Sequence, residues 1–259
     1  MDLGLEGKAA LVTGGSRGIG LASARRLAEE GADVVVCARD AERLDEAVSE
    51  LSGLAGTVSG VPADATDAGD LERVVDAARE RHGRVDVLVN NVGTSLRGSF
   101  AELDDATWQA DLDLKLFSAI RLTRALLDTM GQGARVVNVL STGGKTPAAG
   151  STPTSVTRAA GLALTKALSK ELAPRGVLVN AVCIGIIKSG QQDDRWRAQA
   201  PDTPREEYYR ELAATRGVPL GRIGEAEEAA NVVLFLASAM SSYVTGTSIN
   251  VDGGSAAVL

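Results

Sequence analysis

The stretch of this chain that points most directly to chemistry is the glycine-rich segment Thr13-Gly14-Gly15-Ser16-Arg17-Gly18-Ile19-Gly20. It follows the apolar run 9–12 and leads into residues 21–28, whose apolar side chains have helical spacing. A glycine-rich turn between a buried strand and a helix lets backbone N–H groups approach a pyrophosphate, and the helix N-terminus adds partial positive charge. The segment therefore predicts a dinucleotide site that includes Gly14, Ser16, Arg17, Gly18, Ile19 and Gly20.

A basic residue follows the second apolar run, 33–38, where a dinucleotide fold faces the adenosine ribose. An acid at this point would bind the ribose 2′-hydroxyl, whereas Arg39 suits a 2′-phosphate. Arg17 in the glycine-rich turn is placed to contribute to the same clamp. We therefore predict NADP(H) in preference to NAD(H); the alternative is that Arg39 is a solvated surface residue.

Two later turns carry further candidates for contact with the cofactor. Asp64 follows the third apolar run, 57–62, and is either an acceptor for the adenine amino group or an ordinary loop acid. The turn Asn90-Asn91-Val92-Gly93 closes the fourth run. Because asparagine caps backbone groups and glycine permits close approach, Asn91 and Gly93 are predicted to brace the cofactor, which is compatible with a purely structural turn.

The elements that must position these residues alternate along the chain. Strands are predicted near 8–13, 33–38, 57–62, 85–90, 134–140, 176–182 and 247–251, and helices over 18–30, 40–52, 67–82, 103–130, 155–173 and 225–238. This alternation indicates right-handed βαβ units. We predict an α/β fold over 1–259: a single-domain, Rossmann-type, doubly wound and mainly parallel seven-stranded sheet with helices on both faces. The polar segment 190–217 is predicted to form a lid.

Composition excludes several function classes. The net charge of −7 argues against sequence-independent binding to nucleic acid. The longest apolar runs are far shorter than a membrane span, and the N-terminus lacks the regions of a signal peptide. One histidine, His82, and two distant cysteines cannot form a structural zinc cluster, so no metal site is expected. Cys37 and Cys183 indicate buried free thiols and a cytoplasmic location.

Taken together, these motifs are similar to those of the short-chain dehydrogenase/reductase family, in its branch of reductases that resemble beta-ketoacyl-carrier-protein reductase. Residues 13–20 match its TGxxxGxG loop, residues 90–93 resemble its NNAG motif, and residues 180–185 resemble its NxVxPG segment with Ile184 for proline. The tail, with 243–246 and 251–254, is also typical of it. The resemblance extends the cofactor-binding set to Ala65, Arg158, Gly185, Ile187 and Ser189.

The family's reaction implies four catalytic residues. A tyrosine transfers the proton, a lysine four residues later tunes it and holds the nicotinamide ribose, a serine orients the substrate oxygen, and a helix asparagine supports a water relay. By the family's spacing the serine is Ser141, but Thr154 stands at the tyrosine, Arg158 at the lysine and Lys115 at the asparagine. An aliphatic hydroxyl is a much weaker acid than a phenol, and arginine binds ribose hydroxyls without exchanging protons. The chain is therefore expected to be an atypical member that lacks the Tyr-x-x-x-Lys pair.

Two lysines are the candidates for a replacement acid. Lys115 lies on a helix face that the family directs at the active site, and Lys145 follows Ser141 in a glycine-containing loop. A desolvated lysine beside Arg158 could titrate nearer neutrality. The alternatives are an ion pair of Lys115 with Asp111 or Asp113, and a solvent-exposed loop position for Lys145.

Two functions follow from these residues. The first is an NADP(H)-dependent oxidoreductase that acts on a carbonyl or alcohol of a small molecule, with Ser141, Thr154, Arg158, Lys115 and Lys145 as its catalytic set. The second is a non-redox lyase, isomerase or cyclase, or a catalytically silent protein, on the same scaffold. The resemblance also implies a homo-oligomer, a tetramer or a dimer, formed through 103–130, 155–173 and 225–251.

Overall fold

The computed structural model describes residues 2–259 and contains one seven-stranded sheet whose strands all run parallel. The strands are β1 (Ala9–Thr13), β2 (Asp33–Ala38), β3 (Val58–Pro62), β4 (Val87–Asn90), β5 (Arg135–Ser141), β6 (Leu178–Ile184) and β7 (Ser248–Val251). Their order in the sheet is β3-β2-β1-β4-β5-β6-β7. The order reverses between β1 and β4, and a crevice at the carboxyl ends of the strands is expected at such a point.

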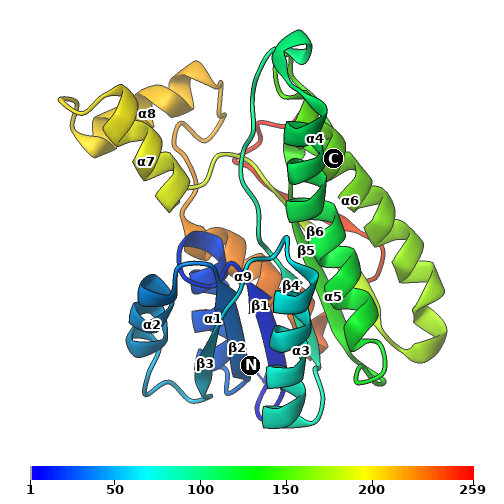
Figure 1. The fold of residues 1–259 in the computed structure, drawn as a ribbon. Helices are drawn as coiled ribbons and strands as arrows, with labels where there is room; N and C mark the ends of the chain where they lie inside the picture. The colour runs from blue at the N-terminus through cyan, green and yellow to red at the C-terminus, as the bar shows by residue number, and fades with distance from the viewer. Residues whose placement is uncertain (1) are drawn as a thin grey trace.

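Alternation along the strands explains why both faces of the sheet are covered. Val34 and Val36 pack on one face, against α1 (Gly18–Glu29), α2 (Ala41–Glu50) and α9 (Ala226–Ala237). Val35 and Cys37 pack on the other, against α3 (Ala68–His82), α5 (Ser118–Leu126) and the end of α6 (Thr152–Glu171). Successive strand residues point to opposite faces, so one apolar run supplies two cores. The predicted α/β fold is confirmed (Figure 1).

The boundaries of the helices follow from local caps. Asp40, Asp67 and Asp104 each accept a hydrogen bond from the backbone N–H three residues later, and α2, α3 and α4 (Asp105–Leu112) begin directly after them. The predicted start of a helix at 155 was wrong by three residues. Pro153 is in the first turn of α6, where its missing N–H costs no hydrogen bond, and the helix begins at Thr152.

The predicted helix over 103–130 is shorter than expected and is interrupted. After the 3-10 turn η1 (Phe100–Glu102), α4 runs to Leu112, a π-helical turn η2 occupies Asp113–Phe117, and α5 follows. Backbone dihedrals stay helical across both junctions, so the axis continues while one turn is wider. Wider turns of this kind are frequent at functional sites. Lys115 lies within this turn.

The segment 190–217 contains two helices, α7 (Gly190–Gln199) and α8 (Arg205–Thr215), separated by a connection that contains Pro201 and Pro204. In Figure 1 both helices extend beyond the sheet at the end of the molecule where α4 also stands. Tyr209 of α8 is buried in a small cluster with Ala213 of the same helix and with Val218 and Ile223 of the loop that follows. Within residues 2–259, no helix has the length and apolar character needed to cross a membrane.

Candidate functional site

A cleft of about 580 Å³ lies at the carboxyl ends of the strands. Its walls come from the glycine-rich turn after β1, the turns after β2, β3 and β4, the loop after β5, α6 and the start of the lid segment. Elements far apart in sequence meet there because parallel strands all end at the same edge. The volume is within the range of ligand-binding clefts.

The glycine-rich turn has the geometry that a bound phosphate requires. Arg17 precedes α1 with extended backbone, and no side chain caps the first N–H groups of that helix. A Cβ added to Gly20 would lie 2.1 Å from the carbonyl oxygen of Gly14 and 2.5 Å from Nδ2 of Asn91. Only glycine fits at that contact. The turn is thus tightly packed underneath while its helix N-terminus stays open to an anion.

Asn91 holds the turn after β4 against the end of β1. Its backbone N–H donates to Oγ1 of Thr13 at 2.9 Å, and its side-chain Nδ2 donates to the carbonyl oxygens of Thr13 at 2.9 Å and Gly14 at 3.3 Å. The amide therefore fixes the crevice between the two strands where the sheet order reverses. These contacts are those of the structural turn, and the bracing of the cofactor by Asn91 and Gly93 stays a prediction.

Basic residues gather where β2 ends. Arg17, Arg39 and Arg43 line the cleft there, and Asp40 is the only acid among the lining residues of the described chain, 2–259. Arg39 is exposed and makes no ion pair within 4.0 Å in that range, while Arg17 reaches Asp194 of α7 at 3.2 Å. A phosphate on a ribose at this point would meet guanidinium groups, and the carboxylates that compete with it are Asp40 and the Asp194 partner of Arg17.

Most of the predicted cofactor residues line the cleft. They are Gly14, Ser16, Arg17, Gly18, Ile19, Arg39, Ala65, Asn91, Gly93, Arg158, Gly185, Ile187 and Ser189. Gly20 lies behind the wall, where its role is to allow the turn to close. Asp64 does not line the cleft: its Oδ1 accepts from both the backbone N–H of Thr66 at 2.9 Å and its hydroxyl at 2.8 Å. The contact of Asp64 with adenine stays a prediction. It would have to be made by Oδ2, because Oδ1 is already bonded to Thr66.

Three of the predicted catalytic residues face the cleft: Ser141, Thr154 and Arg158. Ser141 ends β5, and Thr154 and Arg158 lie one turn apart on α6. The Thr154 hydroxyl accepts a hydrogen bond from the backbone N–H of Leu96 at 2.9 Å and donates to the carbonyl oxygen of Leu96 at 3.0 Å. Thr154 therefore also ties the loop after β4 to α6.

Lys115 lies directly behind Thr154. Its Nζ is 3.0 Å from Oγ1 of Thr154 and forms an ion pair with Asp111, which also accepts from Thr157 at 2.8 Å. The Lys115 side chain is 0% exposed. Both expectations for this residue hold in part: the ion pair with Asp111 is present, and the ammonium also contacts the residue that stands at the tyrosine position.

Burial sets the protonation of this cluster. It lowers the pKa of Lys115 to about 8; the hydrogen bond that Lys115 donates to Asp111 opposes the shift, and the Arg158 charge adds to it. Burial also lowers the pKa of Arg158 to about 10, which leaves the guanidinium charged near neutrality. Arg158 donates to the carbonyl oxygen of Val139 at 3.0 Å. Its guanidinium also packs against Gly93, where an added Cβ would lie 2.3 Å from Nη2. Asp111 pairs with Lys115, and its charge also acts on Arg158 without an ion pair between them.

Lys145 points elsewhere. Its Nζ donates to the carbonyl oxygen of Ser248 at 3.2 Å and to Oδ1 of Asn250 at 2.7 Å, both on β7, and it does not line the cleft. It is half-buried, so it is not the exposed loop lysine of the alternative. The structure brings Lys115 to the site and leaves Lys145 at the edge of the sheet.

Several residues of the cleft were missed from the sequence. Three are arginines on separate segments, and two are hydroxyl residues at the start of α6 that hydrogen-bond one another at 2.8 Å. The arginines have no common motif, so only the fold unites them. The serines lie within four residues of Thr154 and could have been found by their spacing on the helix. They are Arg97, Arg195, Arg216, Ser151 and Ser155.

The two cysteines and the possible metal ligands of residues 2–259 provide no competing site. Cys37 and Cys183 are both free and buried, and burial raises the pKa of Cys37 to about 12. In the described part of the chain, 2–259, no group of three or more His, Cys, Asp or Glu side chains is arranged to hold a metal ion.

Comparison with known proteins decides the family. A family model described as enoyl-(acyl carrier protein) reductase matches residues 14–256. A ketoacyl reductase of the granaticin polyketide synthase of Streptomyces violaceoruber is 40% identical over 251 residues, which cover 95% of this chain and 92% of the relative. The 3-oxoacyl-[acyl-carrier-protein] reductase of Thermotoga maritima is 36% identical over 252 residues, which cover 96% of this chain and 98% of that relative. The chain belongs to the short-chain dehydrogenase/reductase family.

Solved structures of the family agree with this assignment. A short-chain oxidoreductase of Pseudomonas aeruginosa, described as containing an atypical catalytic center, matches with a TM-score of 0.92 and 38% identity over 100% of both chains. Its NADPH-bound structure matches with a TM-score of 0.90 and 38% identity over 97% of this chain and 98% of that one. L-sorbose reductase of Gluconobacter frateurii with NADPH and L-sorbose gives a TM-score of 0.94 and 32% identity over 100% of both chains.

Membership of the short-chain dehydrogenase/reductase family confirms the reaction class of the first predicted function, while its catalytic residues stay a prediction. The chain is an NADP(H)-dependent oxidoreductase that acts on small molecules. Nothing in the comparisons supports the non-redox alternative. The open glycine-rich turn and the arginines beside β2 fit the cofactor that its structural neighbours bind.

Proposed function

We propose that this enzyme reduces a carbonyl group of a small molecule, with Thr154 as the proton donor to the substrate oxygen and Lys115 as the donor that reprotonates Thr154. The observation that carries the proposal is the 3.0 Å contact between Nζ of Lys115 and Oγ1 of Thr154, a hydroxyl that lines the cleft. A lysine supplies the acid strength that an aliphatic hydroxyl lacks.

The cofactor, when bound, supplies the hydride that reaches the carbonyl carbon. The chain's part is to hold both partners and to move the proton. Arg158 has donors left beyond its bond to Val139 and is placed beside Gly93 to bind ribose hydroxyls. Ser141 faces the cleft at the end of β5 and orients the carbonyl oxygen. The glycine-rich turn and the start of α1 hold the pyrophosphate.

The proton follows a short route. The Thr154 hydroxyl, which donates to the carbonyl oxygen of Leu96, turns its O–H toward the substrate oxygen as negative charge develops there. Thr154 gives up that proton and takes one from the Lys115 ammonium, which becomes a neutral amine held by Asp111. The new C–H bond comes from the hydride and the new O–H bond from Thr154, so the carbonyl becomes an alcohol.

Electrostatics favours this direction of proton flow. Lys115 and Arg158 carry two positive charges against the single charge of Asp111, all of them largely shielded from water. A fixed excess of positive charge stabilises negative charge on an oxygen in the cleft before the proton arrives. The arrangement does the work that a tyrosine and a lysine share in the usual members.

The preference for NADP(H) over NAD(H) is part of the same proposal, and Arg39 tests it. Arg39→Gln removes a guanidinium and its hydrogen bonds to the 2′-phosphate. We expect NADPH affinity to fall about 10- to 100-fold and NADH affinity to stay constant, as measured by calorimetric titration. Arg81→Gln, an exposed arginine on α3 outside the cleft, is the matched control. Equal loss for both cofactors would remove Arg39 from the phosphate clamp.

The remaining features of the proposal concern organisation. Residues 1–259 form a single domain in which 190–217 acts as a lid over the substrate. The enzyme works in the cytoplasm as a homo-oligomer, a dimer or a tetramer; its free thiols and exposed apolar side chains such as Phe117 and Phe235 are compatible with this. Sedimentation of the purified protein tests the assembly.

Reduction itself is tested by following NADPH absorbance with a panel of ketones and aldehydes. Consumption of NADPH with matching formation of the alcohol is the expected result. Product formed without any change in absorbance would overturn the proposal, because the proton relay described above operates only together with hydride transfer.

A further inference from the structure

Three arginines form a second basic group in the cleft, beside the catalytic residues. Arg97 lies in the loop after β4, Arg195 on α7 and Arg216 directly after α8, and all three line the cleft. Backbone contacts place the group near the reaction centre. The residue before Arg97 is Leu96, whose N–H and carbonyl both bond to the Thr154 hydroxyl, and Arg195 donates to the carbonyl oxygen of Ser95 at 3.3 Å.

In the described part of the chain, 2–259, these three guanidinium groups have no acidic partners. Within residues 2–259 none of them makes an ion pair at 4.0 Å or less, although the neighbouring lid arginines Arg197 and Arg205 do so with acids of α7. Burial, followed by the charges of Arg216 and Arg195, lowers the pKa of Arg97. Like charges held together without counterions in a cleft favour the binding of an anion.

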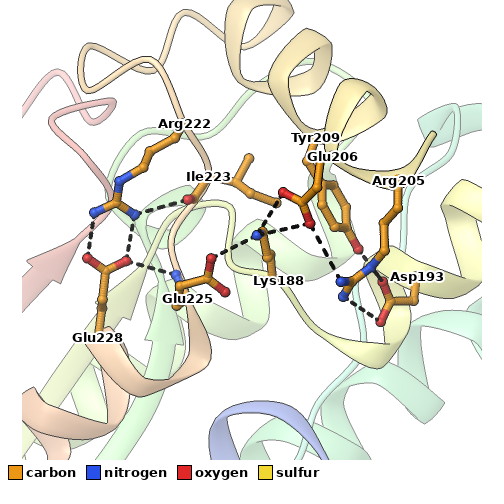
Figure 2. A network of polar contacts seen from close by, with 9 residues as sticks. All are labelled: Lys188, Asp193, Arg205, Glu206, Tyr209, Arg222, Ile223, Glu225 and Glu228. Atoms are coloured by element: carbon orange, nitrogen blue, oxygen red, sulfur yellow. Dashed lines mark hydrogen bonds and ion pairs between the residues drawn. The ribbon is translucent and has the colours of Figure 1, made fainter. Parts of the chain in front are cut away.

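The lid that carries two of these arginines is fixed at its base. Figure 2 shows that Lys188 joins Glu206 of α8, at 3.1 Å, to Glu225, at 2.8 Å, at the start of α9. In the same view Arg205 reaches Asp193 of α7 at 2.7 Å. The Tyr209 hydroxyl donates to Asp193, and this bond helps to raise the pKa of the phenol to about 12, after burial. The network sets the positions of α7 and α8 relative to the sheet.

A second set of contacts holds α7 against the loop that carries Arg97. Nε2 of Gln191 donates to the carbonyl oxygen of Gly93 at 2.8 Å. Gly93 lies two residues before Ser95, which accepts the hydrogen bond from Arg195. The three arginines therefore sit on a loop and a lid that already touch each other. A site that is held in place in this way loses little entropy when a ligand binds.

The cofactor's phosphates are already served by a different group, since Arg17, Arg39 and the start of α1 surround the end of the cleft next to β2. The group at Arg97, Arg195 and Arg216 lies instead beside Thr154. We infer that these three arginines bind an anionic group, a carboxylate or a phosphate, on the substrate itself. This inference rests on the proposed reduction at Thr154 and adds the chemical class of the molecule that is reduced.

The test compares charged and neutral carbonyl compounds with NADPH at saturation. 4-Oxopentanoate is paired with its methyl ester, and dihydroxyacetone phosphate with dihydroxyacetone, so that the two pairs distinguish a carboxylate from a phosphate. We expect kcat/KM to be at least about tenfold higher for the charged member of one pair, because hydrogen bonds to charged groups are among the stronger ones. Arg97→Gln, Arg195→Gln and Arg216→Gln should each reduce this ratio and leave the rate with the neutral member nearly constant.

Arg210→Gln is the matched control, because Arg210 is an exposed lid arginine on α8 that does not line the cleft. Calorimetric titration of the NADP⁺-loaded enzyme with the same four compounds separates binding from reaction. Tight binding of a charged member that weakens in the three variants, without turnover of any compound, would keep the inference and overturn the proposed reduction. Equal binding of charged and neutral members, or unchanged ratios in all three variants, would overturn the inference.

Discussion

Replacing Lys115 by methionine is expected to lower kcat for carbonyl reduction by about 10²- to 10⁴-fold, the usual contribution of a positioned acid. The ammonium is 3.0 Å from Oγ1 of Thr154 and has no exposure to solvent, so no water takes its place easily. NADPH binding should change little, since Lys115 does not line the cleft. Single-turnover absorbance measurements at saturating NADPH would give the rate directly.

The pH profile separates a proton donor from a packing residue. With a pKa of about 8, Lys115 is protonated below that pH and loses its proton above it. Reduction by the unmodified enzyme should therefore fall as pH rises through about 8, and this limb should be missing from the slow residual rate of Lys115→Met. A limb that persists unchanged in the variant would assign it to another group.

Two further variants test the same prediction if the methionine variant folds poorly. Asp111→Asn combined with Lys115→Met removes both charges of the buried pair, so that no carboxylate is left uncompensated. Thr154→Val should lose as much activity as Lys115→Met, and the combination of the two should lose little more, because both interrupt one route. Lys170→Met, an exposed lysine near the end of α6, is the control. Fully additive losses would contradict the relay.

Replacing Gly20 by alanine is expected to abolish tight NADPH binding and to destabilise the fold. The added Cβ would lie 2.1 Å from the carbonyl oxygen of Gly14, which is backbone and cannot rotate aside. Relief of such a contact moves the glycine-rich turn and costs about 2 kcal/mol or more. For a chain of this length that corresponds to a fall in Tm of about 5 °C. Calorimetry of unfolding and titration with NADPH measure the two effects.

Gly131→Ala is the matched control for this substitution. A Cβ at Gly131 meets no heavy atom within 4 Å, and the residue does not have a positive φ. Its Tm and its affinity for NADPH should equal those of the unmodified enzyme. If Gly20→Ala bound NADPH as tightly as Gly131→Ala, the close packing of the turn would not be what shapes the phosphate site.

The fold could be predicted because each strand carries its own signal. The run 33–38 matches β2 at both ends, and the other predicted strands differ by at most two residues at each end, since an apolar run buried on both faces has few alternatives. The helix over 103–130 was harder. Its apolar spacing does not reveal the π-helical turn at Asp113–Phe117. The spacing also does not show where the helical segment begins, after the N-cap Asp104, or where it ends, at the C-cap Leu127.

The site was predictable only where a motif is contiguous or where a helix fixes the spacing. The glycine-rich turn meets the first condition, and the pair Thr154 and Arg158 on α6 meets the second, whereas Ser141 was placed only by the family's spacing. Most of the turn and all three of these residues line the cleft. Lys115 and Lys145 could not be ranked from sequence, because the choice depends on whether each side chain turns toward Thr154 or toward β7. Local spacing carries no information about that direction.

The distribution of charge over the whole chain has a kinetic consequence. Seven arginines and a single acid, Asp40, line the cleft, whereas the remainder of the chain carries 20 basic and 33 acidic side chains. An anion that approaches the molecule is therefore repelled by most of its surface and attracted by one opening. Such a field guides diffusion toward the opening and raises the association rate of charged ligands, and dissolved salt weakens it over a length of about 10 Å at 0.1 M. Anions should enter this enzyme faster in dilute buffer than at high ionic strength, while neutral molecules should arrive at the same rate in both.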